Sequence, residues 1–168
     1  MAGRRRRAPV RHHPHVSVIR RARVADLPDL LSMIEEFYEI DRHPFYRDRV
    51  LAGLKPLLSD DTHGQVWVIL DCDTTDTAGG YAVVTWSWSL ESGGRDCILD
   101  ELYVRERGRG VGAAALAEVL AAAAQAGAKA MFLETEAHNS RVRRFYSRAG
   151  FVPEDSVWMS RALSDTAQ

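Results

Sequence analysis

The sequence predicts a single α+β domain with a mixed, mostly antiparallel central sheet flanked by helices. Apolar residues recur every three or four positions in the first third of the chain, which is typical of amphipathic helices. Alternating segments separated by turn residues follow and indicate an antiparallel meander. From residue 110 onward, helical and extended segments alternate. A chain of 168 residues can bury one core without disulfides, so one domain is expected.

The first half begins with a short extended segment from Val16 and continues with two helices. Asp26 and Pro28 are residue types that cap and begin a helix. The apolar stripe that follows consists of Leu30, Leu31, Ile34, Phe37 and Tyr38. A second helix is expected over residues 44–58, and Pro56 is expected to break its last turn.

Three strands are expected next, at residues 65–72, 80–90 and 96–104. In the middle strand one set of alternate positions, which includes Trp86 and Trp88, is more apolar than the other set. We therefore expect both tryptophans in the core.

From residue 110 onward the sequence predicts, in order, a helix, a strand, a helix and a strand. Alanine and leucine fill residues 110–126, a pattern of high helix propensity, and a glycine follows. A strand is expected over 130–136, a helix over 139–149 capped by Asn139, and a last strand over 157–163.

The charge distribution disfavours several classes of function. Residues 1–15 carry five arginines and no acid, which leaves 17 basic against 23 acidic residues, a net charge of −6. An acidic body argues against a nucleic-acid partner and favours a cationic substrate. No apolar run approaches the roughly 20 residues of a membrane helix, and the arginines lack the apolar segment of an export signal. We expect a cytoplasmic protein with a disordered tail at 1–15, a domain at 16–163 and a short tail at 164–168.

The cysteines and histidines predict no metal site. Cys72 and Cys97 have no second pair of ligands, and the histidines of the N-terminal tail have no partners of fixed geometry. We expect both cysteines to be reduced core thiols.

The strongest motif is a glycine-rich loop at residues 107–112, between a strand and an alanine-rich helix. Glycines let the backbone approach a ligand, and the free amides of the first helical turn attract phosphate. The alternative is a glycine-rich turn with solvated arginines. This loop is not expected to be a nucleotide-hydrolysing P-loop. A P-loop has Lys directly after its last glycine, and here Ala113 follows Gly112. A dinucleotide-binding fold is excluded because too little chain follows and because a meander precedes the loop.

The chain resembles the GNAT superfamily of N-acetyltransferases. The resemblance rests on Arg-x-x-Gly-x-Gly at 107–112, on the strand Leu-Asp-Glu-Leu-Tyr-Val at 99–104, and on Asn139 followed by Phe-Tyr at 145–146 and Ala-Gly-Phe at 149–151. The loop after the strand is short, since only Arg105 and Glu106 precede Arg107. The resemblance implies the fold of that superfamily and an N-acetyltransferase that uses acetyl-CoA.

The resemblance also implies which residues hold the cofactor. They are the backbone of Leu102, Tyr103 and Val104, the loop residues Arg107, Gly108, Arg109, Gly110, Val111, Gly112 and Ala113, and the side chain of Asn139. Tyr146 is the implied proton donor to the leaving thiolate. A helix cap explains Asn139 equally well, and a core tyrosine is the plain alternative for Tyr146.

Acetyl transfer to an amine benefits from a base, and Glu101 is the candidate. In a regular strand Glu101 shares a face with Cys97, Leu99 and Tyr103, and Asp100 points the other way. A bulge would exchange the two acids, so Asp100 is the substitute base. The alternative role for Glu101 is a cross-strand ion pair.

The acceptor is predicted to be a primary amine of a small molecule, which attacks the acetyl thioester directly in a ternary complex. Glu39, Glu91 and Asp100 are the candidate acceptor-binding acids. A protein or peptide amine and a noncatalytic acyl-CoA-binding regulator remain alternatives, as does a nucleic-acid partner for the basic tail. A further alternative is a homodimer in which the last predicted strand pairs with a second copy of the chain.

Overall fold

The computed structural model describes residues 18–71 and 77–163. The chain divides into two compact units, residues 1–134 and 135–168, which are described separately below. The predicted tails at 1–15 and 164–168, the first residues of the initial strand, and Cys72 lie outside the described residues. None of the described helices is long and apolar enough to cross a membrane.

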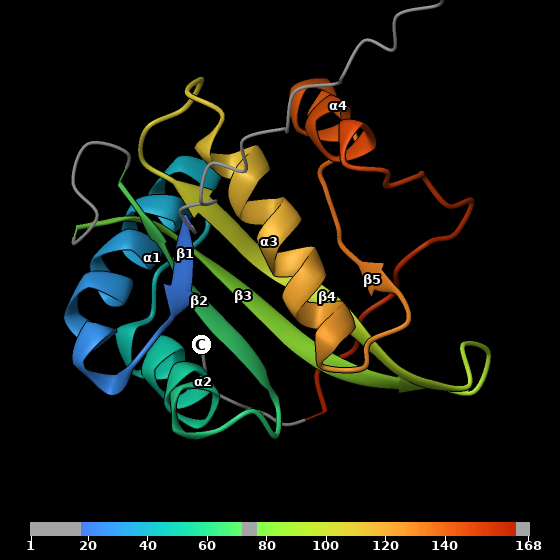
Figure 1. Cartoon of the computed structure of the whole chain (residues 1–168), viewed down its shortest axis with the longest axis horizontal. Helices are drawn as coiled ribbons and strands as arrows, with labels where there is room; N and C mark the ends of the chain where they lie inside the picture. Colours follow the sequence, from blue (N-terminus) through green and yellow to red (C-terminus); the bar gives the residue numbers. More distant parts are fainter. Residues whose placement is uncertain (1–17, 72–76, 164–168) are drawn as a thin grey trace, which may run out of the picture. The chain divides into compact units, whose positions relative to one another are not determined.

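The first unit is built on a five-stranded sheet in the order β1-β2-β3-β4-β5 (Figure 1). The strands are β1 Ile19–Arg21, β2 Gly64–Leu70, β3 Ala78–Ser89, β4 Gly94–Val104 and β5 Met131–Phe132. The first four pair antiparallel, and β5 pairs with β4 in parallel. The predicted mixed, mostly antiparallel sheet is confirmed, although the strand expected over 130–136 forms only two paired residues.

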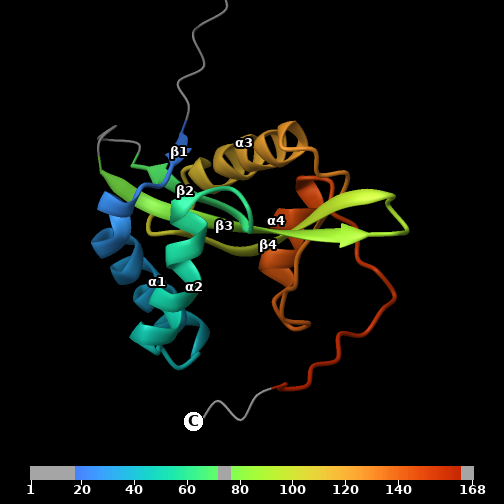
Figure 2. The same ribbon diagram turned by 90° about the horizontal axis from the view of Figure 1, so that it is seen from below.

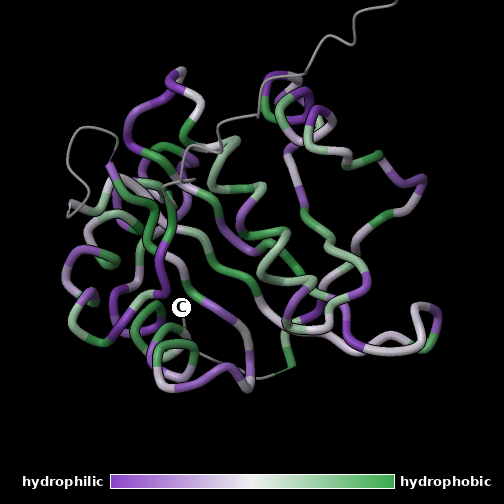
Figure 3. The backbone as a smooth tube through the Cα atoms, viewed as in Figure 1, coloured by the Kyte–Doolittle hydropathy of each residue, from purple (hydrophilic) through white to green (hydrophobic). Residues whose placement is uncertain are grey.

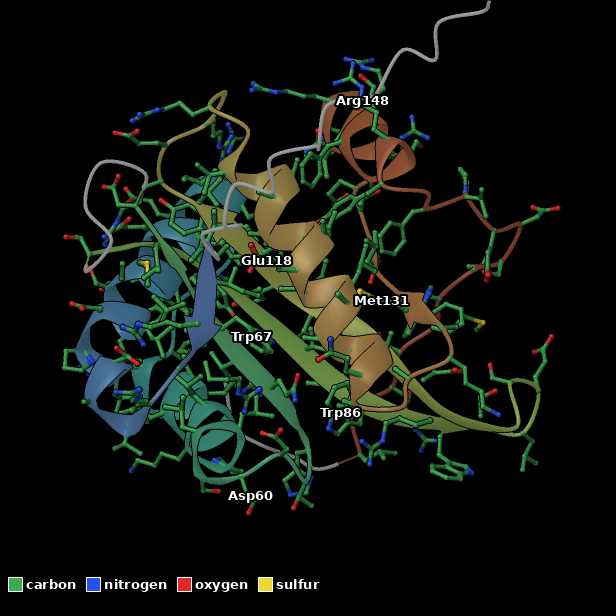
Figure 4. The ribbon with its side chains drawn as sticks, in the orientation of Figure 1. Asp60, Trp67, Trp86, Glu118, Met131 and Arg148 are labelled. Atoms are coloured by element: carbon green, nitrogen blue, oxygen red, sulfur yellow. The ribbon has the colours of Figure 1, made fainter. Side chains whose placement is uncertain are left out.

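Helices cover both faces of this sheet. They are the short 3₁₀ helix Val24–Asp26, α1 Leu27–Asp41, α2 Arg47–Ser59 and α3 Val111–Gln125. Figure 2 shows α1 and α2 on one face of the sheet and α3 on the other. The main core, which includes Leu30, Met33 and Leu54, fills the space under α1 and α2. The amide of Val18 donates a 3.0 Å hydrogen bond to Glu118 of α3, which Figure 4 labels.

The central strand β3 is buried on both faces over residues 81–84. The middle of the sheet is accordingly coloured hydrophobic in Figure 3. The expectation that Trp86 and Trp88 are both core residues is wrong for Trp88, which is 75% exposed. Trp86 is half-buried, and its indole N–H donates to the Asp61 carbonyl at 2.8 Å. These tryptophans lie toward the hairpin end of β3, beyond the doubly covered segment.

The predicted start of α1 is confirmed, with Asp26 at the N-cap and Pro28 in the first turn, but the capping contact and the end of α2 differ from the prediction. The Asp26 carboxylate does not cap α1 but accepts hydrogen bonds from the Arg20 guanidinium at 2.7 and 2.8 Å and from the Arg23 amide at 2.7 Å. Pro56 does not break α2, which continues to Ser59. Near a helix end the missing proline N–H removes one hydrogen bond, and the Ser59 hydroxyl donates to the Pro56 carbonyl at 2.8 Å.

The second unit contains α4 Ser140–Arg148. As predicted, Asn139 caps this helix: its side-chain oxygen accepts from the Val142 amide at 3.1 Å. The strand expected over 157–163 is wrong, because residues 152–163 form neither helix nor strand. Val157 and Met159 are largely exposed. A strand forms only where a neighbour accepts its hydrogen bonds, and no described strand pairs with this segment.

The placement of α3 predicts that two leucines differ strongly in their contribution to the free energy of unfolding. Leu116 of α3 is fully buried, and Leu90 at the β3–β4 turn is 95% exposed. Leu116→Ala should reduce the free energy of unfolding by about 2–5 kcal/mol, because it removes buried apolar volume. Leu90→Ala should change it by less than about 0.5 kcal/mol. Urea unfolding followed by circular dichroism measures both, and equal losses would contradict the placement of α3.

Candidate functional site

A β-bulge in β4 determines where its acidic residues point. Val83 of β3 pairs with Glu101, but the next residue, Val84, pairs with Leu99, so Asp100 is an extra residue without a partner on β3. Paired residues share a face. Glu101 therefore lies on the face of Val83, under α1 and α2, and Leu99 lies on the opposite face. The expected shared face of Glu101 and Leu99 is wrong for this reason.

Two tyrosines hold the carboxylate of Glu101. The Tyr38 hydroxyl of α1 donates to one carboxylate oxygen at 2.9 Å, and the Tyr81 hydroxyl of β3 donates to the other at 2.7 Å. Burial raises the pKa of Glu101, and the negative charge of Asp100 adds to this effect, although the two phenol hydrogen bonds act in the lowering direction. Burial also raises the pKa of both phenols, so they remain donors. Glu101 is thus a fixed carboxylate with increased proton affinity.

A pocket of about 440 Å³ lies between α1, α2 and the sheet and includes this carboxylate. The helices and their connection contribute Ile34, Tyr38, Pro44, Tyr46, Arg49, Val50, Gly53, Leu54 and Leu57. The sheet contributes Val83, Thr85, Asp100 and Glu101. The lining is therefore mainly apolar on the helix side and carries two acids on the sheet side.

Only one of the three predicted acceptor-binding acids lines this pocket. Asp100 does, because the bulge turns it to the same pocket as Glu101 rather than exchanging the two acids. Asp100 keeps more contact with solvent than Glu101, yet burial of its carboxyl raises its pKa. Glu39 lies exposed near the end of α1, and Glu91 lies exposed in the β3–β4 turn, so neither belongs to the pocket.

The loop after β4 is anchored to α1 by an ion pair. The Arg105 guanidinium donates two hydrogen bonds to Glu36 at 2.7 and 2.9 Å, and the Tyr103 hydroxyl donates to the same carboxylate at 3.1 Å. Arg105 holds the pKa of Glu36 below its usual range. The Arg105 amide also donates to the Gly79 carbonyl at 2.9 Å. The start of the loop is therefore fixed to both α1 and β3.

The glycine loop has a backbone suited to an anion. Gly108 and Gly110 have φ of 93° and 82°, a region that favours glycine. The carbonyl of Gly110 accepts from the amides of Ala113 and Ala114, so the amides of Val111 and Gly112 precede the first helical hydrogen bonds of α3. Free amides at a helix start bind phosphate. Much of this loop is coloured hydrophilic in Figure 3, and Arg109 pairs with Glu106 at 2.9 Å.

One edge of β4 is open beside this loop. Leu102, Tyr103 and Val104 pair with β3 on one side. On the other side β5 pairs only with Cys97 and Ile98, so among the described residues no strand covers this edge of β4 beyond Ile98. An uncovered strand edge presents backbone donors and acceptors to a ligand. The unpaired edge thus offers backbone hydrogen-bond groups, and the first amides of α3 suit an anion.

The two remaining predicted site residues lie in the second unit. Asn139 uses its side-chain oxygen as the cap of α4, which leaves its NH₂ group available. Tyr146 packs edge-on against Phe145 and Phe151, with ring centroids 5.0 and 5.6 Å away. Burial raises the pKa of Tyr146 to about 12.

The residues that support the site, Tyr38, Tyr81 and Glu36, belong to no sequence motif and were not predicted. Tyr38 belongs to the apolar stripe of α1, and Tyr81 to the less apolar face of the middle strand. A tyrosine buried in such a stripe needs a partner for its hydroxyl, which was the available signal. The Glu36 partner of Arg105 lies 69 residues away in sequence and gave no local signal.

The hydrogen bonds from the two tyrosines predict how the pKa of Glu101 changes when one of them is removed. Tyr81→Phe removes a hydrogen bond to the charged carboxylate, so the pKa of Glu101 should rise further. NMR titration of carbon-13-labelled glutamate side chains measures the change, and Tyr46→Phe, which removes a hydroxyl that does not contact Glu101, is the control. A lower or unchanged pKa in Tyr81→Phe would show that the contact does not stabilise the charged form.

The chain is similar to known proteins in sequence and in fold. The sequence model of the Acetyltransferase (GNAT) family matches residues 28–151. The uncharacterized N-acetyltransferase YhfO of Bacillus subtilis (strain 168) is 28% identical over 153 residues, which is 89% of this chain and 99% of that protein.

Solved structures share the fold. The integron cassette protein HFX_CASS3, from the mobile metagenome of Cole Harbour Salt Marsh, is 32% identical with a TM-score of 0.76 and coverage of 88% of this chain and 91% of that one. A protein of Arthrobacter sp. FB24, whose name places it among the acetyltransferases, is 27% identical with a TM-score of 0.75 over 90% and 99% of the two chains. The family match spans most of the chain, and the chain belongs to the GNAT family of acetyltransferases.

Proposed function

We propose that this chain transfers acetyl from acetyl-CoA to the primary amine of a small molecule, by direct attack in a ternary complex. The single observation that carries the proposal is Glu101, a carboxylate held by two tyrosines and facing a pocket in a chain of the acetyltransferase family. The family supports acetyl transfer. The pocket supports an acceptor small enough to enter about 440 Å³.

Acetyl-CoA supplies an acetyl group activated as a thioester. The amides of Val111 and Gly112 and the loop from Arg107 to Ala113 would hold its pyrophosphate. The open edge of β4 at Leu102 to Val104 would hold its amide-containing arm. Asn139 would contribute its free NH₂ group. The positive φ of Gly108 and Gly110 supports this assignment, since it lets the loop backbone turn toward a phosphate.

Glu101 would remove a proton from the acceptor. An alkylammonium with a pKa near 10 costs about 4 kcal/mol to deprotonate at pH 7, so a nearby base increases the rate. The raised pKa of Glu101 brings its proton affinity closer to that of the amine. Asp100, which lines the same pocket, would attract the ammonium form and hold it beside Glu101.

Tyr146 would provide a proton to the leaving sulfur. With a pKa of about 12 its phenol is protonated at neutral pH and is available as a donor. Its two aromatic contacts would fix the ring.

Replacement of Glu101 tests the proposal. Glu101→Gln keeps the size of the side chain but cannot accept a proton as a base, so kcat should fall by about 10²- to 10⁴-fold. Thiol release from acetyl-CoA with a panel of amines measures the rate, and calorimetry with acetyl-CoA should show unchanged binding. Glu35→Gln, on the exposed side of α1, is the control. Full activity of Glu101→Gln would exclude Glu101 as the base.

Replacement of Tyr146 tests the donor. Tyr146→Phe should lower kcat by about 10- to 100-fold and leave the affinity for acetyl-CoA within about twofold, because a donor acts in the transition state. The same thiol-release assay and calorimetry separate the two effects. An unchanged kcat would remove Tyr146 from the mechanism.

A further inference from the structure

Gly53 is an unusual residue for its place in the fold. It lies in the interior of α2, where glycine is less stable than alanine, and its φ is not in the left-handed region. Apart from its chain neighbours and the adjacent backbone of α2, a Cβ added to Gly53 would meet no described atom within 4 Å. Neither the backbone nor the packing of the described residues therefore requires glycine at this position.

Gly53 is an exposed residue that lines the pocket. Gly53 lines the pocket together with Val50, Leu54 and Leu57, which lie on the same stripe of α2. Leu54 is buried, and Val50 and Leu57 are partly buried. A side chain at position 53 would extend this stripe into the pocket. The glycine thus keeps an apolar wall open at a cost in helix stability.

The negative and positive side chains of the pocket lie on opposite walls. Asp100 and Glu101 lie on the sheet side, and among the described residues that line the pocket Arg49 of α2 is the one positive charge. An ammonium group is attracted to the two acids. A second ammonium placed near α2 would face Arg49 without a lining carboxylate on that helix, which is unfavourable.

We infer that Gly53 determines acceptor specificity, and that the acceptor is a monoamine with an apolar body. The amine lies at Asp100 and Glu101, and the apolar body lies along α2 against Gly53 and Leu54. This inference names the acceptor class and rests on the proposed function. It excludes polyamines as good acceptors, although the acidic net charge of the domain alone would favour them.

Three probe amines test the inference with wild-type protein and acetyl-CoA. n-Pentylamine has an apolar body, ethylamine lacks most of it, and 1,5-diaminopentane adds a second ammonium to the same chain. Each buried methylene contributes about fourfold to affinity. We expect kcat/KM for n-pentylamine to exceed that of each other amine by at least about tenfold. Equal values for n-pentylamine and either comparison amine would overturn the inference.

Variants at position 53 locate the apolar body. Gly53→Leu should lower kcat/KM for n-pentylamine by about 10- to 200-fold, with ethylamine and the KM for acetyl-CoA changed by less than about threefold. Ala52→Leu is the matched control, because it adds the same side chain at the neighbouring exposed position outside the pocket. Gly53→Ala should raise the temperature of unfolding and still raise the KM for n-pentylamine, which a purely structural role would not do. Unchanged use of n-pentylamine by Gly53→Leu would overturn the inference.

Binding without turnover separates this inference from the proposed function. Calorimetry measures n-pentylamine binding to wild type and to Gly53→Leu. Binding to wild type that is lost in Gly53→Leu supports the acceptor class even where no thiol is released, and in that case acetyl transfer is the part that fails. Absence of n-pentylamine binding and turnover in wild type would overturn the acceptor class itself.

Discussion

The extra residue in β4 is the constraint on which the site depends. Val83 and Val84 are neighbours on β3, but they pair with residues 101 and 99 of β4. Without the bulge at Asp100, one of the two acids would face α3, in the apolar layer formed by Leu116 and Val119. A carboxylate there would have no partner and would cost several kcal/mol. The bulge removes this conflict and brings both acids to one pocket.

Helix α1 links Glu101 to the glycine loop that follows β4. Tyr38 reaches Glu101, and two residues earlier Glu36 reaches Tyr103 and Arg105. The contacts advance along β4 as they go back along α1, so this part of the helix runs antiparallel to the end of the strand. A movement of α1 along the sheet would therefore displace Glu101 and the start of the loop together. The two halves of the proposed reaction share one rigid support in the first unit.

The sequence alone predicted the elements better than their boundaries and contacts. The order of helices and strands as far as α4, the cap at Asn139 and the loop at 107–112 are local patterns, and the structure contains all of them. The strand over 157–163 failed because a strand depends on a partner that local alternation does not reveal. The prediction that Trp88 is buried failed for a different reason. Alternation shows which residues share a face of the sheet, but it does not show where the helices stop covering that face. The sequence could not predict which face of the sheet Glu101 lies on, because the bulge at Asp100 becomes visible only when β4 is paired with β3.

The environment of Glu101 is compatible with the proposed role of this carboxylate as a base. Burial alone would keep it protonated, and strong charged donors alone would make it a weak proton acceptor. Phenols avoid both extremes, because they stabilise the carboxylate without a positive charge. Arginine has the opposite effect at Glu36, where it holds the pKa low and leaves a structural anchor. Two glutamates that contact the same helix–strand pair thus differ in chemistry, because one is buried beside neutral donors and the other lies beside a cation. Burial of Glu101 and the guanidinium beside Glu36 together separate the proposed base from the anchor.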